Sequence, residues 1–193
     1  MKNNITPLKQ TTEFGCLAAC YAMIENHFLK ENSEFTQEME SALTKEAFKS
    51  ETKFNEHFYL NKLARSGHDI KILVETPYML EGYGQLNTKL GNKISISHAL
   101  IGINDYEKFI EEGYVIITLI DLWYLDMIIH YPHYVVIDGC DENSIFLLDP
   151  KYGNEIKFSK YRFQQALDSI KYHLKYSPVL FAIKKSISPQ SSQ

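Results

Sequence analysis

The second half of the chain carries a series of short β-branched and aromatic segments, each bounded by turn residues. These segments are YVIITLID, HYVVIDG, SIFLLDP, NEIKFS and PVLFAIKK, and their composition predicts the strands of a sheet. The sequence CDENS between the second and third segments favours a hairpin. The segments near the N-terminus have helical patterns instead. Helices followed by a run of strands predict an α+β fold, with N-terminal helices packed on a C-terminal antiparallel sheet.

Three helices are predicted near the N-terminus, from CLAACYAMIENHF, EFTQEMESALTKEAFKS and NEHFYLNKLARSG. The first begins with nine residues that are apolar on every side, so we expect a buried central helix. In the second, Glu38, Glu40 and Glu46 predict a solvated face. HDIKILVE predicts a further strand, NDYEKFIEEG a short helix capped by Asn104 or Asp105, and KYRFQQALDSIK another helix. The polar connection between HDIKILVE and NDYEKFIEEG has no clear pattern.

Length and composition predict one domain over residues 1–185 and a flexible tail over 186–193. The chain has 193 residues, a net charge of −4 and scattered Lys and Arg residues, which argues against nucleic acid as a partner. Three cysteines are an odd number, which does not suit a disulfide framework and is typical of a reducing compartment.

No apolar run near the N-terminus resembles a signal peptide. The longest apolar stretch is interrupted by Asp121, Asp126, His130, Pro132 and His133, so it predicts core strands rather than a membrane span. We therefore expect a cytoplasmic protein without stable membrane insertion. Delivery to another compartment or cell stays open.

Cys16 opens the first predicted helix, where unpaired backbone N–H groups and the helix dipole supply partial positive charge. A thiol placed there ionises more readily than one deeper in the helix, such as Cys20. A nucleophilic cysteine also needs a base and a group that orients this base. The hairpin brings His133, at the start of its first strand, near Asp149, at the end of its second. The amide of Gln10 could complete an oxyanion hole with the Cys16 N–H.

The order of these residues resembles that of the bacteriocin-processing leader peptidases, papain-like cysteine peptidases that remove leader peptides after a double glycine. AACYAMI is similar to the nucleophile helix of that family, and HYVVIDG and SIFLLDPKYG are similar to its His-aromatic-Val-Val strand and Asp-Pro turn. The resemblance hardly touches the middle of the chain. It implies a stand-alone domain with the papain-like fold, in which Cys16 is the nucleophile, His133 the general base, Asp149 the orienting residue and Gln10 part of the oxyanion hole.

Two residues depart from the family pattern. Gly15 stands where the leader peptidases usually carry Asp, and Leu17 replaces the glycine that normally follows the nucleophile. A branched side chain at residue 17 is expected to narrow the substrate cleft or to shift the substrate.

Three functions stay open on this fold: a cysteine peptidase, a thiol-dependent acyl or amide transferase, and an inactive domain that binds secretion substrates. Each implies a peptide or protein partner and no cofactor. A zinc site is an alternative, because Cys16 and Cys20 have C-x3-C spacing and His130 and His133 have H-x2-H spacing. Both spacings are loose for a structural zinc site, so no bound metal is expected.

Overall fold

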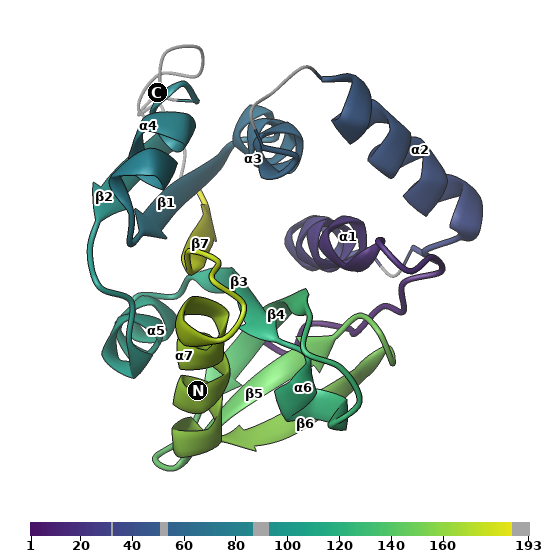
Figure 1. The fold of residues 1–193 in the computed structure, drawn as a ribbon. Coiled ribbons are helices and arrows are strands. Elements are labelled where there is room, and N and C mark those ends of the chain that lie inside the picture. Colours follow the sequence, from purple (N-terminus) through teal and green to yellow (C-terminus); the bar gives the residue numbers. More distant parts are fainter. Residues whose placement is uncertain (32, 51–53, 87–92, 187–193) are drawn as a thin grey trace, which may run out of the picture.

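A seven-stranded sheet forms the centre of the fold (Figure 1). The computed structural model describes residues 1–31, 33–50, 54–86 and 93–186. Its strands are β1 (His68–Val74), β2 (Ile94–His98), β3 (Val115–Asp121), β4 (Pro132–Cys140), β5 (Ser144–Asp149), β6 (Asn154–Ser159) and β7 (Val179–Lys185). They are ordered β2-β1-β7-β3-β4-β5-β6 across the sheet. The pair β1–β2 is parallel, and the other neighbouring pairs are antiparallel.

The helices of the described residues cover this sheet. They are α1 (Cys16–Leu29), α2 (Gln37–Lys49), α3 (Glu56–Arg65), α4 (Pro77–Gly84), α5 (Ile103–Glu111), α6 (Trp123–Asp126) and α7 (Lys160–Tyr172). Helices α1, α2 and α3 come first in the chain, as predicted, and six of the seven strands of this sheet follow α4. The predicted α+β class is confirmed.

Both faces of the sheet are covered, and β3 at its centre is buried along its whole length. On one face, Val115, Ile117 and Leu119 belong to the same core as residues of α1 and α3. On the other face, Ile116 and Ile120 share a second core with residues of α5 and α7. Figure 1 shows α1 and α7 on opposite sides of β4. Because neither face of β3 meets water, its sequence is almost continuously apolar instead of alternating.

Helix α1 lies in the core, as the sequence predicts. Its buried residues are Leu17, Ala18, Ala19, Cys20, Tyr21, Met23 and Ile24. It packs on β4 and also contacts α2 and α3. The helix ends at Leu29, and the next residue, Lys30, has a left-handed backbone and donates its N–H to carbonyl groups of the last turn. This packing fixes the N-terminal end of the helix, where Cys16 lies, relative to the sheet.

The N-terminal segment (residues 1–10) runs beside the β4–β5 hairpin. The N–H of Ile5 donates to the buried carboxylate of Asp138 in β4, at 2.9 Å. The N–H of Gln10 donates to the carbonyl of Pro150, just after β5, at 2.7 Å. The segment is therefore fixed at both ends of the hairpin, and it leads directly into the loop before α1.

The described part of the connection between β1 and α5 contains α4 and β2, which the sequence analysis does not predict. Because β2 runs parallel to β1, the sheet is not wholly antiparallel, and this detail of the prediction was wrong. A connection that contains a helix is long enough to return the chain to a parallel edge strand.

The expected cap of α5 was also wrong. Its N-cap is Gly102, and the Asp105 carboxylate accepts the N–H of Gly102 at 3.0 Å.

Residues 187–193 of the predicted tail lie outside the described residues. Within the ranges given above, every helix is too short or too polar to cross a bilayer.

The aromatic core of the sheet gives a test of the fold. Phe181 in β7 is 1% exposed and lies 5.7 Å from the ring of Tyr83 and 6.4 Å from that of Tyr134. We expect Phe181→Ala to lower the free energy of unfolding by about 3–5 kcal/mol, because it removes buried apolar surface and leaves a cavity. Phe48→Ala is the matched control, since Phe48 is 68% exposed; its effect should stay within about 0.5 kcal/mol. Urea denaturation measures both, and equal losses would contradict this packing.

Candidate active site

A cleft of about 1040 Å³ lies between the helices and the end of the sheet where β4 begins. Cys16, His133 and Gln10 all line it, together with residues of α2, α3 and α4. The connection between β3 and β4 (residues 122–131) supplies another wall through Ile129. The cleft is thus lined by residues that lie far apart in the sequence, from Gln10 to Val179.

Cys16 is the first residue of α1 and is partly exposed in the cleft. As the first helical residue, it has a backbone N–H without a partner inside the helix. The first turn of α1 contains no acidic residue, so its own side chains do not cancel the partial positive charge of the helix end. Cys20, one turn further on, is fully buried, and burial raises the pKa of its thiol well above the usual value. Cys16 is therefore the accessible thiol of this helix.

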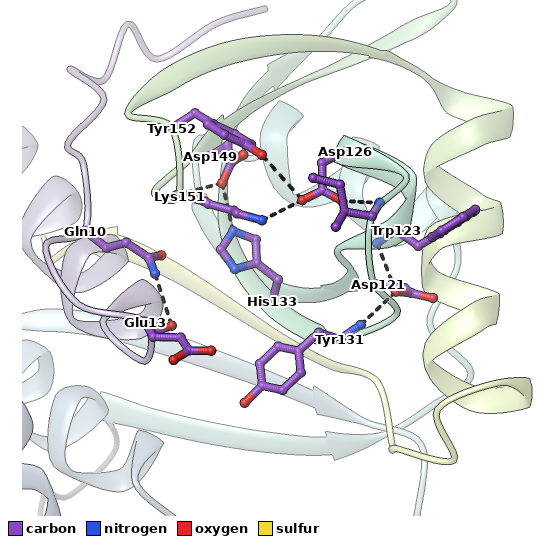
Figure 2. Close-up of polar contacts among 11 residues, drawn as sticks. Gln10, Glu13, Asp121, Trp123, Asp126, Tyr131, His133, Asp149, Lys151 and Tyr152 are labelled. Carbon is purple, nitrogen blue, oxygen red and sulfur yellow. Dashed lines mark hydrogen bonds and ion pairs between the residues drawn. The ribbon is translucent and has the colours of Figure 1, made fainter.

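His133 and Asp149 form a buried pair at the end of the hairpin, as Figure 2 shows. The Nε2 of His133 lies 2.8 Å from Oδ1 of Asp149, and the two side chains are 5% and 0% exposed. The register pairs Val136 with Leu148, so His133 and Asp149 point to the same face of the two strands. The same Oδ1 accepts the N–H of Lys151 at 2.8 Å. With Nε2 directed at the carboxylate, Nδ1 is the ring nitrogen that remains for another partner.

The interactions of His133 favour its charged form. Burial lowers the pKa of His133, but the hydrogen bond to Asp149, the hydrogen bond to Cys16 and the negative charge of both partners outweigh this effect. Together they raise the pKa from 6.5 to about 9. The thiol of Cys16 and the imidazole of His133 therefore lie close enough to interact, and at neutral pH the imidazole carries a proton.

Gln10 reaches the cleft, but its amide is turned toward its own loop. Nε2 donates to the carbonyl of Thr12 at 2.8 Å and to that of Glu13 at 3.2 Å. Figure 2 shows this orientation. The Oε1 atom is buried without a hydrogen-bond partner in the described part of the chain. The structure thus places Gln10 in the same cleft as Cys16, while its Nε2 atom donates to two backbone carbonyl groups.

Asp121, at the end of β3, holds the connection 122–131 in place. It is fully buried, and its carboxylate accepts the N–H groups of Trp123 at 3.1 Å and Tyr131 at 3.2 Å. His130 Nδ1 lies 2.7 Å from the other oxygen. Although burial raises the pKa of Asp121, these and other hydrogen bonds hold it below its usual value. One ionised carboxylate therefore fixes both ends of this wall of the cleft.

A second contact joins this wall to the turn after Asp149. The Nζ atom of Lys151 lies 2.6 Å from the carboxylate of Asp126, and the hydroxyl of Tyr152 donates to the same oxygen at 3.4 Å. Figure 2 shows the two segments side by side. The sequence analysis missed these residues. Asp121 and Asp126 were noted only as interruptions of an apolar run, and that interruption was the one signal that could have singled them out.

The four residues considered for zinc have separate roles in the structure. His130 binds Asp121 and stacks on the ring of Trp123 at 4.8 Å, while Cys20 lies in the core. In the described ranges, no group of three His, Cys, Asp or Glu side chains is arranged to hold a metal ion.

The different burial of the three cysteines can be tested by alkylation. In a Cys140→Ala background, we expect iodoacetamide to modify Cys16 alone, because Cys20 is buried and its pKa is raised. Mass spectrometry of the digested protein locates the label. The protein that also carries Cys16→Ala should remain unlabelled under the same conditions. Equal labelling of the two proteins would show that Cys16 is not the reactive thiol.

Comparisons with known proteins relate both the sequence and the fold to peptidases. The model of the family described as "Peptidase_C39 like family" matches residues 83–170. This range includes His133 and Asp149 but neither Cys16 nor Gln10. Among curated proteins, a search finds no match.

Two solved structures share the fold. The peptidase domain of Streptococcus ComA, a bi-functional ABC transporter involved in a quorum sensing pathway, has a TM-score of 0.52 and 13% identity, over 95% of this chain and 100% of that chain. A double glycine motif protease from an AMS/PCAT transporter, in complex with the leader peptide, has a TM-score of 0.53 and 14% identity, over 96% and 94%. The predicted resemblance is confirmed: the chain is similar to the C39-like peptidase family and has the papain-like fold of the C39 peptidase domains.

Proposed function

We propose that this chain is a papain-like cysteine peptidase that hydrolyses a peptide bond in the cleft beside Cys16. One observation carries the proposal. Cys16 stands at the N-terminus of a buried helix and interacts with His133, whose other ring nitrogen binds the buried carboxylate of Asp149. This is the arrangement of nucleophile, base and orienting group that covalent catalysis requires.

Each residue has one task in the reaction. The Cys16 thiolate attacks the carbonyl carbon of the scissile bond and forms a tetrahedral intermediate. The His133 imidazolium then donates its proton to the leaving amine, the C–N bond breaks, and a thioester to Cys16 remains. Neutral His133 next takes a proton from water, whose oxygen attacks the thioester; the C–S bond then breaks, the carboxylic acid leaves, and the Cys16 thiolate and the His133 imidazolium are restored. Throughout, Asp149 holds the ring orientation and stabilises the imidazolium.

The oxyanion hole is the part of the site that requires a rearrangement. The N–H of Cys16 supplies one donor. The Nε2 of Gln10 supplies the second only if it exchanges the carbonyls of Thr12 and Glu13 for the substrate oxygen. A negatively charged oxygen is a stronger acceptor than a peptide carbonyl. We therefore propose that Gln10 turns toward the substrate as the tetrahedral intermediate forms.

The walls of the cleft favour a peptide with apolar side chains. Several large apolar residues that line it are more than half exposed to solvent: Phe14, Phe48, Tyr78, Ile129 and Tyr176. A group of exposed apolar side chains around a cleft is typical of a binding site. The similar AMS/PCAT protease was solved with a leader peptide, and this supports a peptide as the substrate. Leu17, which is 9% exposed, lies in the wall next to Cys16, so substrate residues beside the scissile bond should be small.

A binding domain without catalysis is the second candidate. The orientation of the Gln10 amide favours it, because both recorded hydrogen bonds of Nε2 go to the protein's own carbonyls. The two candidates differ in product formation and not in peptide binding, so hydrolysis must be measured directly.

Peptide hydrolysis tests the proposal. We expect the wild-type protein to cleave members of a library of quenched fluorescent peptides that includes double-glycine sequences. Cys16→Ala should lower kcat by about 1,000-fold or more, because no other group can form the thioester. Cys140→Ala, the same change outside the cleft, should retain the wild-type rate. If Cys16→Ala keeps its activity, the proposed mechanism is wrong. If the wild type binds peptides without cleaving them, the chain is a binding domain and not a peptidase.

The pH dependence of kcat in the same assay gives a second test. His133 has a raised pKa of about 9, so it remains protonated through neutral pH and loses its proton as the pH rises through 9. We therefore expect kcat to fall above about pH 9, since the leaving amine then lacks its proton donor. A fall centred near the ordinary histidine pKa of about 6.5 would contradict the assignment.

Amine acceptors added to the assay will show whether the thioester passes to water or to an amine.

A further inference from the structure

Glu40 differs from the other acidic residues of α2. The sequence analysis assigned Glu38, Glu40 and Glu46 to a solvated face. Glu38 and Glu46 are exposed, but Glu40 is completely buried, so the prediction for Glu40 was wrong. A buried carboxylate is costly unless its oxygens receive hydrogen bonds. The partners of Glu40 therefore indicate which part of the molecule requires it.

Within the described part of the chain, the Glu40 carboxylate accepts its hydrogen bonds from the loop before α1, which we call the nucleophile loop (residues 11–15). The N–H of Thr11 donates to Oε2 at 2.6 Å, and the N–H of Thr12 donates to Oε1 at 2.8 Å. The hydroxyl of Thr12 donates to Oε1 as well. Hydrogen bonds to a charged acceptor are stronger than those between neutral groups. One side chain of α2 thus fixes the peptide groups of this loop.

Gly15 leaves the space that this carboxylate occupies. A Cβ atom at residue 15 would overlap both oxygens of Glu40. The backbone of Gly15 has φ −82° and ψ −1°, a conformation open to any residue. The glycine is therefore required by the nearby carboxylate and not by its backbone conformation.

The nucleophile loop connects two residues of the proposed site. Gln10 precedes it and is fixed at its own N–H by Pro150, while Cys16 follows it as the first residue of α1. The carbonyl of Thr12 also holds the Gln10 amide. Glu40 therefore binds two peptide groups of the short segment that joins Gln10 to Cys16.

We infer that Glu40 is a positioning residue, which holds the nucleophile loop so that the Gln10 amide and the Cys16 N–H can meet the substrate oxyanion. This inference rests on the proposed function, since an oxyanion hole has no role without catalysis. The hydrogen bonds of Glu40 go to Thr11 and Thr12 and not to the thiol or the imidazole, so it acts through the loop. Its loss should therefore impair the step that forms the intermediate and leave peptide binding largely intact.

Glu40→Gln tests this role with little change in shape. The new amide keeps one acceptor and places an NH2 group against the loop donors. We expect kcat to fall about 10- to 100-fold with KM within about twofold, because small displacements of catalytic groups have effects of this size. Glu46→Gln, the same change on the exposed part of α2, should leave both constants unchanged. Thr12→Val is a milder variant that removes one hydrogen bond, and it should lower kcat in the same direction.

Moving the carboxylate tests the link between Gly15 and Glu40. Gly15→Asp alone should be strongly impaired, because two carboxylates then compete for one space. Glu40→Ala alone should also lose activity, since the loop N–H groups lose their acceptor. In the double variant the Asp at residue 15 has room and supplies a carboxylate, so we expect its kcat to exceed that of either single variant. If the two single substitutions instead lower kcat independently, so that their factors multiply in the double variant, the link between Gly15 and Glu40 is wrong.

Amide hydrogen exchange separates this inference from the proposed function. In Glu40→Gln, the exchange of the Thr11 and Thr12 amides should accelerate about tenfold or more. If the wild type cleaves peptides while Glu40→Gln changes neither kcat nor this exchange, the positioning role is wrong and the peptidase assignment stands. If the exchange accelerates but KM rises and kcat is unchanged, Glu40 serves binding and the inference is also wrong. A wild type that cleaves nothing overturns both the catalytic role and the proposed function, whatever the exchange rates.

Discussion

The buried contact between His133 and Asp149 is the constraint on which the geometry of the site depends. It exists because β4 and β5 pair in a register that puts both residues on one face at the same end of the hairpin. The N-terminal segment is fastened to both ends of this hairpin, at Asp138 and Pro150. The loop before α1 therefore begins from a fixed point, and the helix that carries Cys16 is directed at the imidazole.

The electrostatic balance of the site follows from this contact. A buried imidazole would normally be neutral at pH 7, because burial disfavours the charged form. Here hydrogen bonds to Asp149 and Cys16, together with the negative charge of the carboxylate and of the sulfur, reverse that preference and raise the pKa of His133 to about 9. The carboxylate in turn is held by the N–H of Lys151. The site thus places a protonated imidazole next to the sulfur of Cys16 in a cleft with many apolar side chains.

Local patterns in the sequence were sufficient to predict α1, the hairpin and the pairing of His133 with Asp149. Strand alternation and turn residues act over a few positions, and they fix the hairpin register without knowledge of the rest of the fold. The chemistry of a cysteine at a helix N-terminus then related Cys16 and Gln10 to this pair, and the family resemblance implied the role of each residue. Contacts between segments far apart in the sequence could not be predicted in this way. The burial of Glu40 depends on a loop 28 or 29 residues away, and the parallel pairing of β2 depends on the path of a long connection.

The charge state of His133 is the most direct test of this account. We expect NMR of the protein with 15N-labelled histidine to show the His133 ring titrating near pH 9, and Asp149→Asn to move this midpoint toward the ordinary value of about 6.5. Such a result would establish that the imidazole is held as a cation between the carboxylate and the thiol. A wild-type midpoint near 6.5 that is insensitive to Asp149 would contradict the account.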